Sequence, residues 1–183
     1  KGENSMLVYF NPGHDRDLDS GAVNRHSGAR ECDKAYELTM KLKALMGEKG
    51  VDTCVDQRDD LYDLCDAANE TGADIFVSIH FNAFNEVATG TETLISSSPA
   101  SLILGHCIQS HVRAALMLPD RGLKERMDLL VLRGTIMPAV LVEVCFLDND
   151  EDLYRYETNV DQVARALCEG ICTYITQAAE NVA

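Results

Sequence analysis

The sequence predicts an α/β fold, with a mostly parallel sheet in a single domain. Short apolar runs alternate with stretches of helical periodicity along the whole chain, as in βαβ proteins. One of these runs, within residues 73–83, is almost continuously apolar, which is typical of a strand buried on both faces. The chain has 183 residues, of which 46% are hydrophobic, and this is enough for one compact core. The sequence shows no internal repeat and no domain boundary.

Each predicted strand is a short apolar run that ends at a turn signal. The central run, 75–79, ends at His80 and is followed by a small polar turn. The first run, 7–10, ends at an Asn-Pro-Gly turn, and His14 follows directly. The strands are predicted at residues 7–10, 51–55, 75–80, 90–95, 129–132 and 139–144.

The predicted helices carry apolar residues at helical spacing. In the first helix, Ala35, Leu38 and Leu42 fall on one face, and Gly47 closes the element. Two further segments are predicted to be loops: residues 15–28, which are long enough to suggest a functional loop, and the polar residues 119–126. The helices are predicted at residues 30–46, 58–70, 100–116 and 160–178.

The composition argues against several kinds of partner. Sixteen Lys and Arg against thirty Asp and Glu give a net charge of −14, without a basic cluster that could follow a phosphate backbone, so no nucleic acid is expected. No apolar run approaches the roughly 20 residues of a bilayer span, so no membrane is expected either. We see no signal sequence and therefore expect cytoplasmic synthesis. The seven cysteines are odd in number and scattered, which favours reduced thiols.

Two histidines lie just beyond the carboxyl ends of predicted strands. His14 follows the first strand, and His80 ends the central one. Ligands of open α/β sheets bind at this edge, which makes both residues candidates for a site. A single histidine at such a position is also explained by one structural hydrogen bond. His106 and His111 fall inside a predicted helix, so we assign no chemistry to them.

Two glutamates occupy positions that favour apolar side chains. Glu31 is the first residue of the inward face of the first helix. The helix dipole explains an acidic residue in the first turn. An unpaired charge that points inward would nevertheless be costly, and a bound metal would remove that cost. Glu143 interrupts the apolar run 139–144. A structural ion pair explains such a residue, and so does a functional carboxylate.

Together these four residues predict a hydrolytic metal site. Two His and one Glu are the ligands of many catalytic zinc ions, which keep a fourth position for water. Zinc polarises a carbonyl group and lowers the pKa of its water. A further carboxylate can then carry a proton from the water to the leaving nitrogen, and this role would fall to Glu143. The ligands are dispersed, and no His-Glu-x-x-His motif is present.

Several motifs also occur in a characteristic order. They are Gly13-His14, Glu31, Ala-Asn at 68–69, the whole of 73–83, Gly-Thr-Glu-Thr at 90–93, Arg-Gly-Leu-Lys at 121–124, and 138–149 with Glu143 at its centre. In this order they resemble the zinc-dependent N-acetylmuramoyl-L-alanine amidases of the type 3 family. The resemblance extends from about residue 7 to residue 177.

The resemblance implies a fold, an activity and a set of site residues. The fold would be a twisted sheet of about six strands, flanked by helices on both faces. His14, Glu31 and His80 would bind Zn²⁺, and Glu143 would be the catalytic glutamate. The activity would be hydrolysis of the amide between N-acetylmuramic acid and L-alanine, with peptidoglycan as the partner. Residues 6–178 would form the amidase catalytic domain, 1–5 a linker or cloning remnant, and 179–183 a tail.

The sequence departs from the family pattern at two positions. The family usually has Gly where Cys145 stands, beside the predicted catalytic residue, and often Arg where Cys65 stands; neither change removes a ligand. Without a signal peptide or wall-binding module, the chain looks like the catalytic domain of a phage endolysin or an autolysin, which acts on the cell wall after release or export. Two alternatives remain: a zinc peptidase or carboxypeptidase that cleaves the stem peptide, and a non-catalytic wall-binding module.

Overall fold

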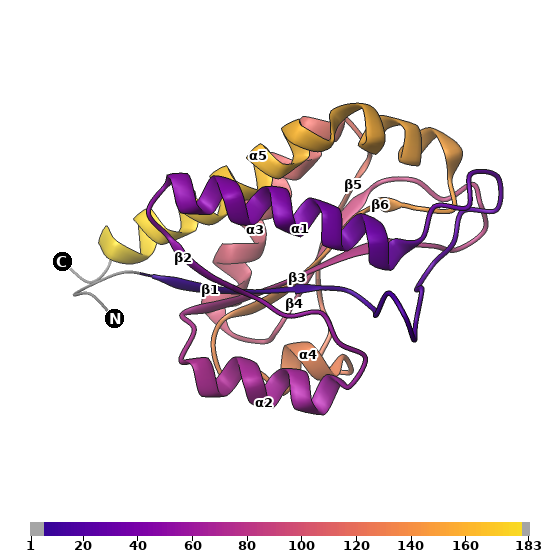
Figure 1. The fold of residues 1–183 in the computed structure, drawn as a ribbon. Helices are drawn as coiled ribbons and strands as arrows, with labels where there is room; N and C mark the ends of the chain where they lie inside the picture. Colours follow the sequence, from indigo (N-terminus) through magenta and orange to yellow (C-terminus); the bar gives the residue numbers. More distant parts are fainter. Residues whose placement is uncertain (1–5, 181–183) are drawn as a thin grey trace.

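The chain forms a six-stranded sheet between two layers of helices, as a computed structural model shows for residues 6–180 (Figure 1). The predicted linker 1–5 and residues 181–183 of the predicted tail lie outside the described residues. The strands are β1 (Leu7–Pro12), β2 (Asp52–Val55), β3 (Ile75–Asn82), β4 (Thr91–Ile95), β5 (Asp120–Glu125) and β6 (Ala139–Phe146). The helices are α1 (Glu31–Glu48), α2 (Leu61–Thr71), α3 (Pro99–Leu116), α4 (Leu130–Arg133) and α5 (Asp150–Glu180).

The sheet is mostly parallel, as the sequence predicts. Its strand order is β2-β1-β3-β6-β4-β5, and of the five strand pairs in this sheet of the described residues, only β4 with β6 is antiparallel. Helices α1, α3 and α5 cover one face of the sheet, and α2 and α4 cover the other (Figure 1). The α/β class and the arrangement of helices on both faces are therefore confirmed.

The face under α2 and α4 changes from apolar to polar along each central strand. Alternate residues of a strand share a face, so Phe76, Ser78 and His80 of β3 lie in one row. In β6 the corresponding row contains Leu141 and then Glu143. Phe76 and Leu141 belong to the core beneath α2 and α4. The polar ends of both rows lie at the carboxyl edge, and His80 pairs with Glu143 in the register of β3 and β6.

Two elements differ from the prediction. Residues 119–126 were predicted to be a loop but contain β5, an edge strand whose polar side chains are exposed or half-buried on both sides, so that it lacks apolar alternation. Residues 129–132 were predicted to be a strand but contain most of α4, a single helical turn that buries Val131 and Leu132. Four apolar residues are too few to distinguish the two periods.

The last helix begins ten residues before the predicted one. Its helical geometry is interrupted at Asn159, with φ −126° and ψ 18°, and the predicted helix 160–178 corresponds to the part beyond this break. All seven cysteines are free, as predicted. Across residues 6–180, no helix combines the length and apolar character that a membrane span requires.

A buried carboxylate at the start of α5 fixes the loop that joins β3 to β4. Asp152 is fully buried and accepts hydrogen bonds from Thr89 Oγ1 at 2.5 Å and from the backbone N–H of Gly90 at 3.1 Å. The N–H of Phe146, at the end of β6, donates to the same carboxylate at 3.1 Å. Asp152 thus joins the β3–β4 loop to the strand that carries Glu143.

We expect Asp152→Ala to lower the free energy of unfolding by about 3 kcal/mol, because three donors lose a charged acceptor in a buried position. Urea denaturation measures the change. Asp161→Ala is the matched control, since this exposed carboxylate pairs only with Lys41 at the surface, and the unfolding free energy should stay nearly constant. Equal stability of the two variants would contradict the anchoring role.

Candidate metal centre

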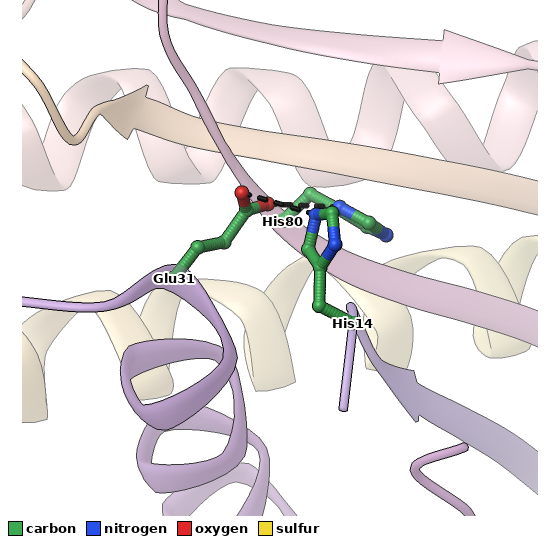
Figure 2. A group of neighbouring side chains, drawn as sticks. All are labelled: His14, Glu31 and His80. Atoms are coloured by element: carbon green, nitrogen blue, oxygen red, sulfur yellow. Dashed lines mark hydrogen bonds and ion pairs between the residues drawn. The ribbon is translucent and has the colours of Figure 1, made fainter. Parts of the chain in front are cut away.

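Three of the four predicted site residues converge at the carboxyl edge of the sheet. Figure 2 shows Glu31 reaching from the first turn of α1 towards His80 on β3 and towards His14 in the loop after β1. One ligand atom from each of the three residues lies within 4.8 Å of the others. Segments far apart in the sequence thus form a compact group of two imidazoles and one carboxylate.

Glu31 is held by four nitrogen atoms. The backbone N–H of Phe81 donates to Oε1 at 2.9 Å, and Nδ1 of His80 also lies 2.9 Å from that oxygen. The backbone N–H of Ala22 donates to Oε2 at 2.9 Å, and Nε2 of His14 lies 3.1 Å from it. The side chain is only 5% exposed, so these contacts offset the cost of burying a charge and fix the carboxylate's orientation.

His14 is oriented by its backbone and by a second carboxylate. Its φ of 62° lies in the left-handed region, which costs a non-glycine residue about 1–2 kcal/mol. Nδ1 lies 2.7 Å from Oδ2 of Asp19, so Nε2 is the ring nitrogen that faces Glu31. Carboxylates in this position commonly orient histidines that bind metals.

Two glycines make room for the imidazoles. A Cβ on Gly13 would lie 2.6 Å from Nδ1 of the His80 ring, and a Cβ on Gly21 would lie 2.6 Å from Oε2 of Glu31. Both distances are shorter than real Cβ contacts. The chain therefore has no side chain where it passes closest to the cluster.

The charges of Glu31 and His14 stabilise each other. Burial by itself raises the pKa of Glu31, but the hydrogen bonds and charges of the two imidazoles outweigh it and hold this pKa below its usual range. In turn, the hydrogen bond to Glu31 is the main reason why the pKa of His14 rises to about 9, despite opposition from burial. Without a metal, the cluster therefore binds a proton at neutral pH.

Glu143, the fourth predicted residue, lies beside the cluster but outside the group of ligands. Burial raises the pKa of its carboxyl group to about 7; the charge of His80 opposes this rise, and the charges of Glu31 and Glu92 add to it. Among the described residues, nothing forms a hydrogen bond with its buried Oε2. A carboxyl group with one buried oxygen that lacks a partner, and with a pKa near neutrality, is suited to exchanging protons with a ligand.

A cavity of about 210 Å³ opens beside the cluster. It reaches from the two histidines to the covering helices α2 and α4. Its walls are mainly apolar and are formed by Asn11, His14, Asp19, Arg58, Asp59, Leu61, His80, Leu129, Leu130, Val131 and Leu141.

Two acidic residues near the site were not assigned from the sequence. Asp19 lies in the aperiodic loop 15–28, and no local pattern distinguishes it from the other acidic residues there. Glu92 gave no such signal as Glu143 did, because it lies between two threonines at the start of β4 and does not interrupt an apolar run. It is 5% exposed and stands opposite Glu143 in the register of β4 and β6.

We expect Gly13→Ala to weaken zinc binding about tenfold to hundredfold, because the new methyl group would displace the ring of His80. Competition with a chromogenic chelator measures the affinity. Gly47→Ala is the control, since a Cβ in this α1 position meets no atom within 4 Å. Unchanged affinity in a folded Gly13→Ala protein would show that His80 is not a ligand.

We also expect zinc affinity to rise about tenfold per pH unit between about pH 6 and 8. The pKa of His14 is about 9 without metal, so the ring is protonated over this range and must lose a proton to become a ligand. Calorimetry in buffers with different ionisation enthalpies counts the protons released. An affinity that does not depend on pH would argue against His14 as a ligand.

Comparison with known proteins identifies relatives over almost the whole chain. Residues 8–173 match the family model described as N-acetylmuramoyl-L-alanine amidase. An uncharacterized cell wall amidase of Bacillus anthracis is 31% identical over 100% of this chain and 38% of its own length. The endolysin of Bacillus phage SPP1 is 34% identical over 91% of this chain and 65% of its own length. The chain thus spans less than two thirds of both relatives.

A solved structure agrees with this match. The crystal structure of an N-acetylmuramoyl-L-alanine amidase from Clostridium difficile 630 has a TM-score of 0.85 to this chain at 31% identity, and the match covers 94% of this chain and 98% of that one. The family match, the relatives and the fold agree with one another. The chain belongs to the type 3 family of N-acetylmuramoyl-L-alanine amidases.

Proposed function

We propose that the protein uses a bound zinc ion to hydrolyse the amide between the lactyl group of N-acetylmuramic acid and the L-alanine of the peptidoglycan stem peptide. Membership of the amidase family supports a reaction of this class. The observation that carries the proposal is the position of Glu143, a buried carboxyl group with an unpaired oxygen, next to a cluster of two histidines and one glutamate.

The donor set of the cluster fits zinc. His14, Glu31 and His80 supply two imidazoles and one carboxylate, a combination found in catalytic zinc sites with an open fourth position. A zinc ion held there would polarise the amide carbonyl and lower the pKa of a water molecule. Asp19 and the N–H of Phe81 keep two of these ligands oriented, so little rearrangement is needed on binding.

Glu143 is the group that we assign to proton transfer. Its pKa is about 7 without a metal, and the charge of a nearby zinc ion would favour the ionised form, the form that can act as a base. The ionised form accepts a proton from the attacking water, and the protonated form then donates it to the nitrogen of L-alanine as the amide bond breaks. Its place on β6 opposite His80 puts it beside the cluster, where the amide carbonyl would bind.

The surroundings suit the muramoyl side of this substrate. The cavity beside the cluster presents apolar side chains such as Leu61, Leu129 and Val131. An amide-linked muramoyl residue carries no charge but has polar hydroxyl and acetamido groups, and the cavity also offers them polar side chains such as Asn11 and Arg58. Cleavage of this bond would detach peptides from the glycan, which agrees with a role in cell-wall lysis.

We expect Glu143→Gln to retain zinc and to lose about 10²–10⁴-fold in kcat, the usual contribution of general acid–base catalysis. Glu31→Gln should instead lose most of its zinc, because an amide is a weaker ligand than a carboxylate. Metal analysis of both purified variants, together with rates on peptidoglycan, separates the two roles. A zinc-free Glu143→Gln protein would reverse the assignment.

Mass spectrometry of the digested peptidoglycan tests the bond itself. We expect new L-alanyl amino termini and intact glycan strands, and we expect removal of the metal by a chelator to abolish their formation. Cleavage inside the stem peptide would indicate a peptidase instead. New reducing sugar ends, or undiminished turnover by metal-free protein, would contradict the proposal.

A further inference from the structure

Two cations beside Glu143 have no role in the proposed reaction. Arg121 and Lys124 lie on the edge strand β5, and each forms an ion pair with Glu92 of β4. Glu92 is the register partner of Glu143 in the antiparallel pair of β4 and β6, so the two side chains share a sheet face. The two cations therefore contact a carboxylate that stands one strand spacing, roughly 5 Å, from Glu143.

Glu92 lies beneath these cations rather than between them and the solvent. Its side chain is 7% exposed, whereas those of Arg121 and Lys124 are 38% and 44% exposed. Oε1 of Glu92 accepts a hydrogen bond from Asn82 Nδ2 at 2.7 Å, and Oε2 faces both cations. Two positive charges thus meet the single carboxylate of Glu92.

The donors of the two cations are only partly used. Nε of Arg121 lies 3.6 Å from Glu92, too far for a hydrogen bond, and Nη1 donates to the carbonyl oxygen of Thr89 at 3.4 Å, longer than a usual N–H···O bond. The guanidinium carbon lies 5.0 Å from the centre of the Phe146 ring, which helps to hold its position. A guanidinium has five N–H groups and an ammonium has three, so donors remain for an incoming anion. A carboxylate is the anion that such a pair suits.

The charges of the proposed substrate indicate which part of it would bind to Arg121 and Lys124. The cavity on the other side of the cluster, with both apolar and polar walls, is the place proposed for the uncharged muramoyl residue. The stem peptide, by contrast, carries free carboxylates. One extended residue spans about 3.3–3.6 Å, so a carboxylate on the residue after L-alanine can reach the cations while the reacting amide lies at Glu143.

We propose that Arg121 and Lys124 form a binding subsite for the first carboxylate of the stem peptide beyond L-alanine. The subsite directs the peptide over β4 and β5 and the sugar towards α2 and α4. It rests on the proposed function, since it assumes that the amide to L-alanine is the bond cleaved. Glu92 positions the subsite by fixing both cations from below.

The test uses two synthetic muramoyl peptides that differ only in this group, a free carboxylate in one and a carboxamide in the other. We expect the zinc-loaded wild-type protein to cleave the acid with a kcat/KM about tenfold to hundredfold higher, the range of a charged hydrogen bond. Lys124→Met should remove most of this preference, mainly by raising KM for the acid, because an interaction with the bound substrate is lost. Lys124→Arg should restore the preference.

Lys41→Met is the control for loss of one positive charge, since Lys41 pairs with Asp161 on the opposite layer of the molecule. It should leave the acid preference unchanged. The acid preference can also be tested on the wild-type protein alone. Added salt should decrease this preference, because the two cations are partly exposed.

The possible failures are distinguishable. Equal cleavage of acid and amide by the wild-type protein would overturn the subsite and leave the amidase reaction intact. The subsite would also be overturned if Lys124→Met lowered kcat/KM equally for the acid and the amide. In that case the ion pairs of Glu92 would have only a structural role, holding β5 against β4. Failure of the wild-type protein to cleave either amide would overturn the proposed function and the subsite with it.

Discussion

The site depends on how one buried carboxylate is held. Glu31 is nearly inaccessible to solvent, and it accepts backbone hydrogen bonds from Ala22 and Phe81 while facing the rings of His14 and His80. A buried carboxylate without such partners would be unstable. The requirement to satisfy it therefore fixes the start of α1 against the end of β3 and the loop after β1. Those contacts already bring together three groups that could hold a metal ion, so the atoms that satisfy Glu31 are the same atoms that a metal would use.

The rest of the edge is arranged across the strands rather than along the chain. His80 on β3, Glu143 on β6 and Glu92 on β4 follow one another in register across the sheet. The first contributes to the metal group, the second carries an unpaired oxygen, and the third holds two cations. Each of these neighbouring strands thus presents a different chemical group at the carboxyl edge. A substrate that lay across the strands would contact His80, Glu143 and the Glu92 cations one after another.

Much of this could be predicted from the sequence because parallel strands share a carboxyl edge. That rule is enough to group His14 with His80. Glu31 and Glu143 can be recognised because each stands at a position where the sequence pattern favours an apolar side chain. Glu92 could not be placed in this way, because it stands near the beginning of β4, and only the antiparallel pairing with β6 brings it to the same edge. Local sequence does not specify the direction of a strand in its sheet. The edge strand β5 was missed because partial exposure on both sides removes the apolar alternation that indicates a strand.

The position of β5 has a consequence for how proteins of this architecture can diversify. An edge strand is paired on one side only, so its side chains can change without repacking a second neighbour. His80 lies on β3 and Glu143 on β6, and both strands are interior and paired on both sides, so substitutions there disturb two neighbours. Under the proposed function, the residues that contact the peptide lie on β5 and the proton carrier lies on β6, so a change of substrate preference would need no change on the strand that carries the proton.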